Sequence, residues 1–404
     1  MKTIFSVWLL ATTFIMSATL LIAQEQGPQG NDVLVPDSSK ENPGDVRIRA
    51  HTNHVVKVRG AAKITGPTGE TPQSIRPVYK LLSTGGAGVI AIVDAFDYAT
   101  AASDFDVFSR QFGLPLSSDR VCNGANPCFQ KVYASGTKPK ANCGWAQEAA
   151  LDIQWAHAMA PSAQIVLVEA ASNSFSDLFY AVDVATSIVQ GGANNGGIAA
   201  GQVSMSWGGS EFSSEINEDS HFTGNGVVYF AASGDTGGKT IYPGTSPNVV
   251  SAGGTTINRN SSGKFLSETA WSGSGGGPSK YEPRPPYQDA IVGIVGSKRG
   301  TPDYSFDANP SSGASVYDST ACQGMSGWMV FGGTSVSSPS LAGIVNLANH
   351  LYSSTDSELS TIYSYLGDTT AFRDIISGTA GSYSAKGGWD FVTGVGSNQG
   401  LVGK

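Results

Sequence analysis

Residues 88–94 (Gly-Val-Ile-Ala-Ile-Val-Asp) form a continuous apolar run, which is the pattern of a strand buried on both faces of a parallel sheet. From about residue 75 onward, such runs alternate with helical patterns. The predicted helices are 99–112, 146–159 and 175–189, and the further strands are 164–168, 202–206, 226–231 and 248–251. This βαβ alternation predicts an α/β fold with a mostly parallel central sheet and helices on both faces. We expect irregular structure at 257–330, followed by a long core helix at 336–352.

The N-terminus has the pattern of a secretory signal. Lys2 supplies a positive charge, and residues 4–23 are apolar apart from Ser and Thr. We predict a signal peptide at 1–23; the alternative is a membrane anchor of about twenty residues. Residues 24–74 are polar and rich in Pro, Gly, Asn and Asp, so we predict an extended leader with a possible short strand at 54–58. The remaining domain spans 75–404.

Charge and composition narrow the choice of partners. The formal net charge of the 404-residue chain is −8, which argues against nucleic acid as a partner. Charged residues make up only 14% of the chain, so few carboxylate ion pairs can be lost in acid. No later segment is apolar enough to span a bilayer. We therefore expect a secreted monomer that has no membrane partner once the signal is removed.

Four cysteines are consistent with an oxidising compartment and two disulfides. Three connectivities are possible. We favour Cys122–Cys128, which closes a short Gly/Asn/Pro loop, together with Cys143–Cys322. A zinc site is disfavoured because the five histidines do not cluster with the cysteines.

Residues 332–339 (Gly-Gly-Thr-Ser-Val-Ser-Ser-Pro) place Ser335 at the entrance of a helix, with Pro339 in the first turn. A serine in that position has its backbone N–H and the helix dipole directed at a developing oxyanion. The alternative is an ordinary helix N-cap. The two preceding glycines permit close approach of a substrate, which favours a nucleophile.

A nucleophilic serine needs a base, and two carboxylates are candidates. Glu148 and Asp152 are four residues apart on one face of the predicted helix 146–159, among apolar neighbours. Two close carboxylates cannot both ionise cheaply, so they would share a proton. The alternative is a solvated helix face, although like charges at this spacing are unfavourable without a function.

The histidines are weaker candidates for the base. His157 has the surroundings of a core residue, and the others lie in the leader or lack a motif: His51, His54, His221 and His350. Two aspartates follow predicted strands, at the carboxyl ends where functional residues of α/β sheets gather. They are Asp235, within Ser233-Gly-Asp-Thr-Gly-Gly238, and Asp94. For both, the alternative is a turn or a helix cap.

Five segments together resemble the sedolisin, or serine-carboxyl peptidase, family over residues 75–404. They are 144–152 (Gly-Trp-Ala-Gln-Glu-Ala-Ala-Leu-Asp), 231–237 (Ala-Ala-Ser-Gly-Asp-Thr-Gly), 242–256, 332–339, and the tail with 373–375 and 388–390. The resemblance implies a subtilisin-like three-layer sandwich and polypeptide substrates. Ser335 would attack the scissile carbonyl, Glu148 would act as general base and then acid, Asp152 would orient Glu148, and a protonated Asp235 would donate to the oxyanion. An acidic pH optimum follows.

The same resemblance implies one structural Ca²⁺ in a loop at about 372–398. Carboxylates of Asp374 and Asp390 and carbonyls of Ile375, Lys386 and Gly388 would form the all-oxygen shell that this ion prefers. Lys386 departs from the family pattern, which favours glycine there; Gly387 would serve after a one-residue shift.

A second departure lies upstream, where only about fifty unpatterned residues stand in place of the family's folded propeptide. Our main prediction is an acid-acting endopeptidase, with a tripeptidyl-type exopeptidase as the alternative. Three rivals are a Ser-His-Asp peptidase using Asp94 and Ser335, a glycosidase using Glu148 and Asp152, and a silent secreted binding protein. The Ser-His-Asp reading lacks a His-Gly-Thr-His type segment, and the glycosidase leaves Asp235 and Ser335 unexplained.

Overall fold

The computed structural model of the protein describes residues 32–58, 66–122, 126–191 and 197–404. The predicted signal peptide at 1–23 and its cleavage site lie outside these ranges, as do two parts of the predicted leader. Within the described ranges, no helix has the length and apolar character that crossing a membrane requires.

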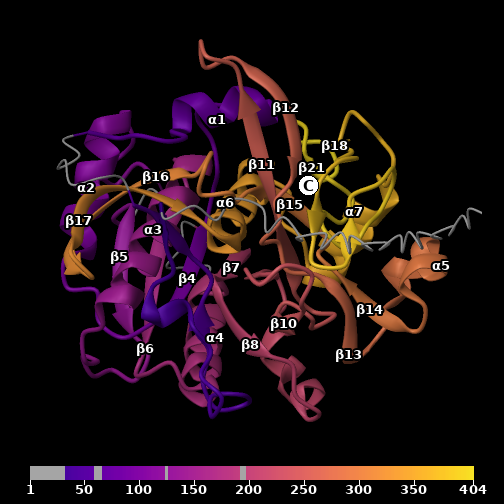
Figure 1. Cartoon of the computed structure of the whole chain (residues 1–404). Helices are drawn as coiled ribbons and strands as arrows, with labels where there is room; N and C mark the ends of the chain where they lie inside the picture. The colour runs from indigo at the N-terminus through magenta and orange to yellow at the C-terminus, as the bar shows by residue number, and fades with distance from the viewer. Residues whose placement is uncertain (1–31, 59–65, 123–125, 192–196) are drawn as a thin grey trace, which may run out of the picture. The chain divides into compact units, whose positions relative to one another are not determined.

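A ten-stranded, mostly parallel sheet forms the centre of the domain (Figure 1). The main path is β18 (Phe372–Arg373), β21 (Ser397–Asn398), β15 (Tyr304–Asp307), β11 (Val250–Arg259), β9 (Val227–Ala232), β7 (Gly201–Met205), β4 (Val89–Ala95), β6 (Gln164–Ala170) and β5 (Phe129–Tyr133). Neighbours from β21 to β5 run parallel. Only β18 and β12 (Phe265–Ala270) pair antiparallel. The predicted sheet type is confirmed.

Helices cover both faces of this sheet because its strands are apolar on both sides. Ile90 and Ile92 of β4 share a hydrophobic cluster with residues of α1 (Pro72–Tyr79), α2 (Ala101–Phe112), α3 (Cys143–Met159), α6 (Thr334–Leu347) and α7 (Thr355–Ser364). Val89, Ala91 and Val93 belong to a second cluster with α4 (Phe175–Val189). The alternation of side chains along β4 thus produces three layers, as predicted.

The prediction of irregular structure at 257–330 is wrong. These residues contribute β11, β12 and β15, together with β13 (Gly277–Pro283), η4 (Pro286–Ile291), α5 (Val292–Val295), β14 (Lys298–Thr301) and a hairpin of β16 (Ala314–Cys322) with β17 (Met325–Gly332). β12, β13, β14, β16 and β17 pair antiparallel, and β12 and β13 mix buried with exposed residues, so these strands lack the continuous apolar runs of the core. The long core helix predicted at 336–352 has different ends, since α6 runs from Thr334 to Leu347.

The predicted leader is ordered over 32–58 and joins two antiparallel sheets. β1 (Val33–Leu34) and β3 (Val55–Lys57) extend the β16–β17 hairpin, and β2 (His51–Thr52) pairs with β8 (Trp207–Ser210), which also pairs with β10 (Ile241–Tyr242). The short strand predicted at 54–58 is therefore present as β3. Other short elements are η1 (Asp37–Ser39), η3 (Glu215–Phe222), and the β19 (Thr379–Ala380) and β20 (Tyr383–Ser384) pair.

Both favoured disulfides are confirmed. Cys122 is bonded to Cys128, and Cys143 is bonded to Cys322. The second bond spans 179 residues and ties the first residue of α3 to the end of β16. Because β17 then runs directly into α6, this bond links the helix of Glu148 to the hairpin that leads to Ser335.

Candidate active site

Ser335 is the second residue of α6, so its backbone N–H has no helical carbonyl to bond. That N–H donates instead to the carbonyl oxygen of Asn53, 2.9 Å away. The Ser335 Oγ donates to the carbonyl oxygen of Ser206 at 3.1 Å, and the side chain is fully buried. Gly333, the N-cap, has φ of +101°, and a Cβ there would lie 2.2 Å from the Asn53 carbonyl oxygen and 2.5 Å from Asp235 Oδ2. Only glycine leaves room for both oxygens beside the serine.

The expected position of Pro339 in the first helical turn is wrong, because α6 already begins at Thr334. Asp235 explains the earlier start: its Oδ1 accepts the Thr334 backbone N–H at 2.7 Å and the Thr334 hydroxyl at 2.9 Å, and so caps the helix. Pro339 has no N–H, so the carbonyl of Ser335 lacks its helical donor. The Ser206 hydroxyl lies 3.3 Å from that carbonyl oxygen.

Glu148 and Asp152 both lie on α3, in which every residue from Gly144 to Met159 is buried. A helix that is apolar around most of its circumference belongs in the core, and it carries the two carboxyl groups inward. The Ser206 hydroxyl donates to Asp152 Oδ1 at 2.9 Å. The same hydroxyl lies 3.3 Å from the Ser335 carbonyl oxygen, so Ser206 connects α3, which carries Glu148 and Asp152, to α6, which carries Ser335.

Burial dominates the electrostatics of this pair. It raises the pKa of Glu148 to about 8, and the Ser335 hydroxyl, the Asn53 backbone N–H and Asp152 oppose this rise. It also raises the pKa of Asp152 well above its usual range, with Glu148 as the next cause. The two groups therefore titrate together and favour holding a proton in this buried state.

Asp235 completes the group from the end of β9. Its Oδ1 is occupied by Thr334, whereas its buried Oδ2 has no hydrogen-bond partner among the described residues. Burial raises the pKa of Asp235 to about 7, against the lowering effect of the Thr334 backbone N–H and hydroxyl. A proton on this carboxyl would thus reside on Oδ2, which lies 2.5 Å from the position of a Cβ on Gly333, as the Asn53 carbonyl oxygen does at 2.2 Å.

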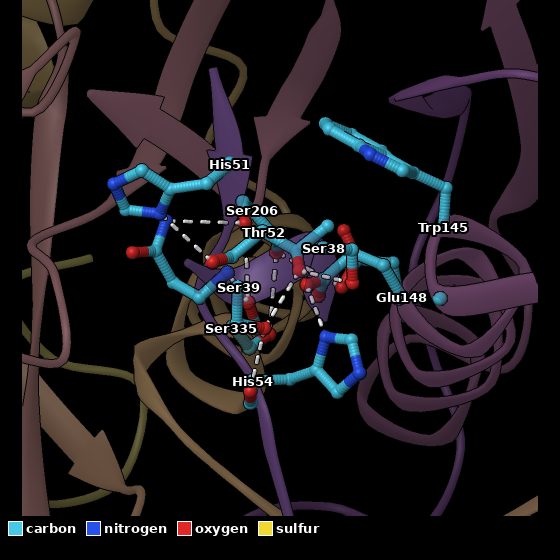
Figure 2. Close-up of polar contacts among 12 residues, drawn as sticks. Ser38, Ser39, His51, Thr52, His54, Trp145, Glu148, Ser206 and Ser335 are labelled. Carbon is cyan, nitrogen blue, oxygen red and sulfur yellow. Dashed lines mark hydrogen bonds and ion pairs between the residues drawn. The ribbon is translucent and has the colours of Figure 1, made fainter. Parts of the chain in front are cut away.

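His54, set aside in the sequence as part of the leader, reaches the centre of the site (Figure 2). Its Nδ1 lies 2.8 Å from Glu148 Oε2, and both side chains are fully buried. Burial lowers the pKa of His54 to about 4, so the imidazole is neutral above that pH. Among the described residues, the Ser335 hydroxyl is hydrogen-bonded to the backbone of Ser206 and Asn53, and neither His54 nor Glu148 is bonded to it directly.

The structure places the remaining candidates as follows. Asp94, at the end of β4, is buried and neither of its carboxyl oxygens has a hydrogen-bond partner in the described ranges, so it caps no helix. Burial, then Asp152 and Glu148, raise the pKa of Asp94 well above its usual range.

His157 is a core residue, as predicted, with its Nε2 at 3.0 Å from the carbonyl oxygen of Pro115. Ser206 could have been noticed in the sequence because it directly follows β7, as Asp235 follows β9 in the parallel sheet.

The predicted calcium loop brings its two aspartates to one backbone segment. Asp374 Oδ2 accepts the N–H of Gly388 at 3.0 Å, and Asp390 Oδ2 accepts the N–H of Lys386 at 3.0 Å. Asp374 Oδ1 is buried with no hydrogen-bond partner in the described chain, although no group of three or more His, Cys, Asp or Glu suited to a metal was found there. Lys386 does not need a positive φ, unlike Gly388 at +83°. Asp374 Oδ1 is thus the carboxylate oxygen of this loop that has no hydrogen-bond donor among the described residues, and a carboxylate oxygen is a ligand type that Ca²⁺ prefers.

Comparisons with known proteins agree with this geometry. The model of the subtilase family matches residues 134–396. The chain is 35% identical over 172 residues to sedolisin of Pseudomonas sp. (strain 101), covering 39% of this chain and 28% of that protein. It is 32% identical over 288 residues to kumamolisin of Bacillus sp. (strain MN-32), covering 63% and 49%. These matches thus span about half, or less, of the relatives' own length.

Among solved structures, Pseudomonas sedolisin, described as a serine-carboxyl proteinase complexed with two molecules of pseudo-iodotyrostatin, superposes with a TM-score of 0.67. The sequence identity is 25%, and the match covers 82% of this chain and 96% of that one. The two chains therefore share the same overall fold.

Proposed function

We propose, from the premise that this chain belongs to the subtilase family in its sedolisin branch, that the protein is a secreted, acid-acting serine-carboxyl endopeptidase. Ser335 attacks the scissile carbonyl, and Glu148 takes the serine proton and passes it to the leaving nitrogen. Asp152 orients Glu148 and shares its proton, and Ser206 holds Asp152. The Ser335 N–H and a protonated Asp235 stabilise the oxyanion.

One observation carries this proposal. The Ser335 backbone N–H donates to the carbonyl oxygen of Asn53, and this oxygen and Asp235 Oδ2 lie 2.2 and 2.5 Å from the position that a Cβ on Gly333 would occupy, while Asp152 and Ser335 share the Ser206 hydroxyl. A carbonyl held by a helix N-terminal N–H, beside a carboxyl that can donate only when protonated, fits acyl transfer in acid. The arrangement also gives Asp235 a role that a glycosidase built on Glu148 and Asp152 would not use.

Endopeptidase action is supported by the path of the leader. Upstream of Asn53, backbone pairing continues through Thr52 and His51 to Ala50, whose N–H donates to the carbonyl of Asn173 at 2.9 Å, and Arg49 forms a bridge with Ser174. A tripeptidyl exopeptidase would need the cleft to close three residues upstream of the scissile bond. Here the cleft accepts a longer chain, as an endopeptidase requires.

The two key protonation states set the working pH. Glu148 must be ionised to accept the serine proton, and Asp235 must be protonated to donate. His54 covers Glu148 in this structure, and burial is the largest cause of the raised pKa of Glu148. A cleft without the leader leaves Glu148 more exposed, which lowers its pKa and provides the base in acid.

A Ca²⁺ ion would bind Asp374 and Asp390, with carbonyls of the same loop, and would neutralise two acidic groups that have no charged partner among the described salt bridges. Its contribution when bound is structural, because it ties the loop at 386–390 to the end of β18. Secretion fits the two disulfides, which persist in oxidising compartments.

The test compares wild type with Ser335→Ala on a denatured protein at about pH 4 and pH 7, with sequencing of the products. We expect cleavage in acid within the chain by wild type, and a loss of at least about 1,000-fold in Ser335→Ala. Activity that falls below about pH 6 would indicate a histidine base instead. Release of tripeptides alone would indicate the exopeptidase, and a wild type without activity would leave a silent binding protein.

A further inference from the structure

A cavity of about 330 Å³ lies beside Asp235, just after the end of β9. One wall is the segment between β9 and β10, with Thr240, and the other is the start of β13, with Gly277 and Lys280. Ser210, the last residue of β8, also lines the cavity. The cavity therefore adjoins the carboxyl group that would stabilise the oxyanion.

Glu211 is bonded to both walls of this cavity. It directly follows β8, and its side chain is buried. The Thr240 hydroxyl donates to Glu211 Oε2 at 2.5 Å. The Ser279 hydroxyl and the Lys280 N–H donate to Glu211 Oε1 at 2.5 and 3.0 Å. Because the two oxygens of one carboxyl group can serve several donors, a single side chain holds the two walls together.

Three further carboxyl groups interact with Glu211 or with one another: Glu215 and Asp219 of η3, and Glu282 of β13. We call these four residues the wall cluster. Glu215 and Asp219 each accept hydrogen bonds from neighbouring polar groups. Glu282 is fully buried, and neither of its carboxyl oxygens has a hydrogen-bond partner among the described residues. A buried carboxyl group without donors is costly to ionise.

The wall cluster has no cation of its own. Among the salt bridges that the described residues form, none includes one of its members. Arg299 of β14 is the cation that acts on Glu282, but its guanidinium donates to both carboxylate oxygens of Asp303. The titratable and charged groups around the cluster are Glu218, Tyr242, Lys280, Tyr287, Lys298 and Arg299.

Burial decides the protonation of two members of the wall cluster. It raises the pKa of Glu282 to about 8, and the charges of Asp219 and Glu211 act in the same direction. Burial also raises the pKa of Glu215 to about 9, with Glu211 and Glu282 adding to the rise and the Phe212 N–H opposing it. Both groups are therefore neutral in acid, and they become charged only as the pH rises through about 8 and 9.

We propose that Glu211 is a positioning residue, which sets the shape of the cavity beside Asp235 for a substrate side chain, and that the neutral forms of Glu215 and Glu282 keep it in place; the proposal rests on the function proposed above. In acid, Glu211 holds both walls and its carboxyl neighbours Glu215 and Glu282 carry no charge. In alkali, new negative charges form in the same buried cluster, and they repel one another without a cation to balance them. The walls then separate and substrate binding weakens, whereas the reacting groups keep their places.

The first experiment measures KM and kcat of the full chain on a peptide at about pH 5. Glu211→Ala should raise KM by at least about tenfold, and Thr240→Val, which removes one hydroxyl, should raise it by about threefold to tenfold. In both variants kcat should change by less than about twofold. Glu218→Gln is the matched control, because Glu218 lies on the same helix η3 but contacts only His221, and its KM should stay unchanged.

The outcomes of this experiment are separate for the two proposals. A wild type that cleaves peptides normally while Glu211→Ala and Thr240→Val leave KM unchanged would overturn the positioning role alone. A fall in kcat without a change in KM would also overturn it. A wild type that cleaves no peptide would overturn the proposed function and, with it, the role of Glu211 in substrate binding.

The second experiment follows hydrogen exchange of the backbone amides at 236–241 and 277–283, which needs no activity. Between about pH 7 and pH 9, exchange in the wild type should speed up by more than its intrinsic rise with pH, because the charged cluster loosens the walls. Glu282→Gln has the same shape and no charge at any pH, so its exchange should follow the intrinsic rise more closely. The same acceleration in both proteins would overturn the role of the wall cluster.

Discussion

The unpartnered oxygen of Asp235 leads to a prediction about the pH limit of activity. Oδ1 is committed to two donors from Thr334, at 2.7 and 2.9 Å, so only Oδ2 is left to serve the oxyanion. A carboxyl donates a hydrogen bond only while it is protonated, and burial raises the pKa of Asp235 to about 7. Wild-type kcat should therefore fall as the pH rises through about 7.

Two substitutions separate the proton from the donor. Asp235→Ala removes one oxyanion donor, which should raise the barrier by about 2.7–4 kcal/mol and lower kcat by about 10² to 10³. Asp235→Asn has the same shape: Thr334 holds the amide oxygen in the Oδ1 position, so the amide nitrogen takes the Oδ2 position. This donor does not titrate. The variant should keep most of its activity in acid and should retain it above pH 7.

The assay is kcat at saturating peptide between about pH 3 and pH 9, with intact mass used to record how much leader remains attached. Thr334→Val is the matched control: its lost hydroxyl bond favoured the ionised carboxylate, so the pKa of Asp235 should rise and the alkaline limit should move upward. The reasoning would be refuted if kcat of Asp235→Asn fell above pH 7 in the same way as kcat of the wild type, or if Asp235→Ala had an unchanged kcat.

Three further predictions concern other parts of the molecule. Ser206→Ala removes the donor to Asp152 Oδ1, so kcat should fall about tenfold with little change in KM, as measured on the same peptide; an unchanged kcat would contradict the positioning role. Removing Ca²⁺ with a chelator, or replacing Asp374 by Asn, should lower the thermal midpoint by several degrees in a calorimeter, and a chelator effect that persists unchanged in the variant would exclude this site. Burial raises the pKa of Glu282 to about 8, above its unfolded value, so the folded state keeps a proton that the unfolded state loses. Stability should therefore fall between about pH 4.5 and pH 8, and urea midpoints of Glu282→Gln should show a smaller fall.

Local patterns in the sequence determined the core of the fold. The apolar run around Ile90 predicts a strand buried on both faces, and β4 is buried throughout. The predicted helix 175–189 matches α4 at both ends. The four-residue spacing of Glu148 and Asp152 needs only a helix to bring them to one face. Each of these features depends on neighbours within a few turns, so periodicity is enough to predict it.

Only the tertiary structure determines which residues contact Glu148 and Ser335. His54 meets Glu148 across 94 residues of sequence, and Asn53 meets Ser335 across 282. The leader has no periodicity of its own, because its strands are two or three residues long and are stabilised by edges contributed from β8 and β17. Such pairing is specified by the partner surface. Sequence therefore predicted candidate catalytic groups, and only the fold revealed the segment of the same chain that lies against them.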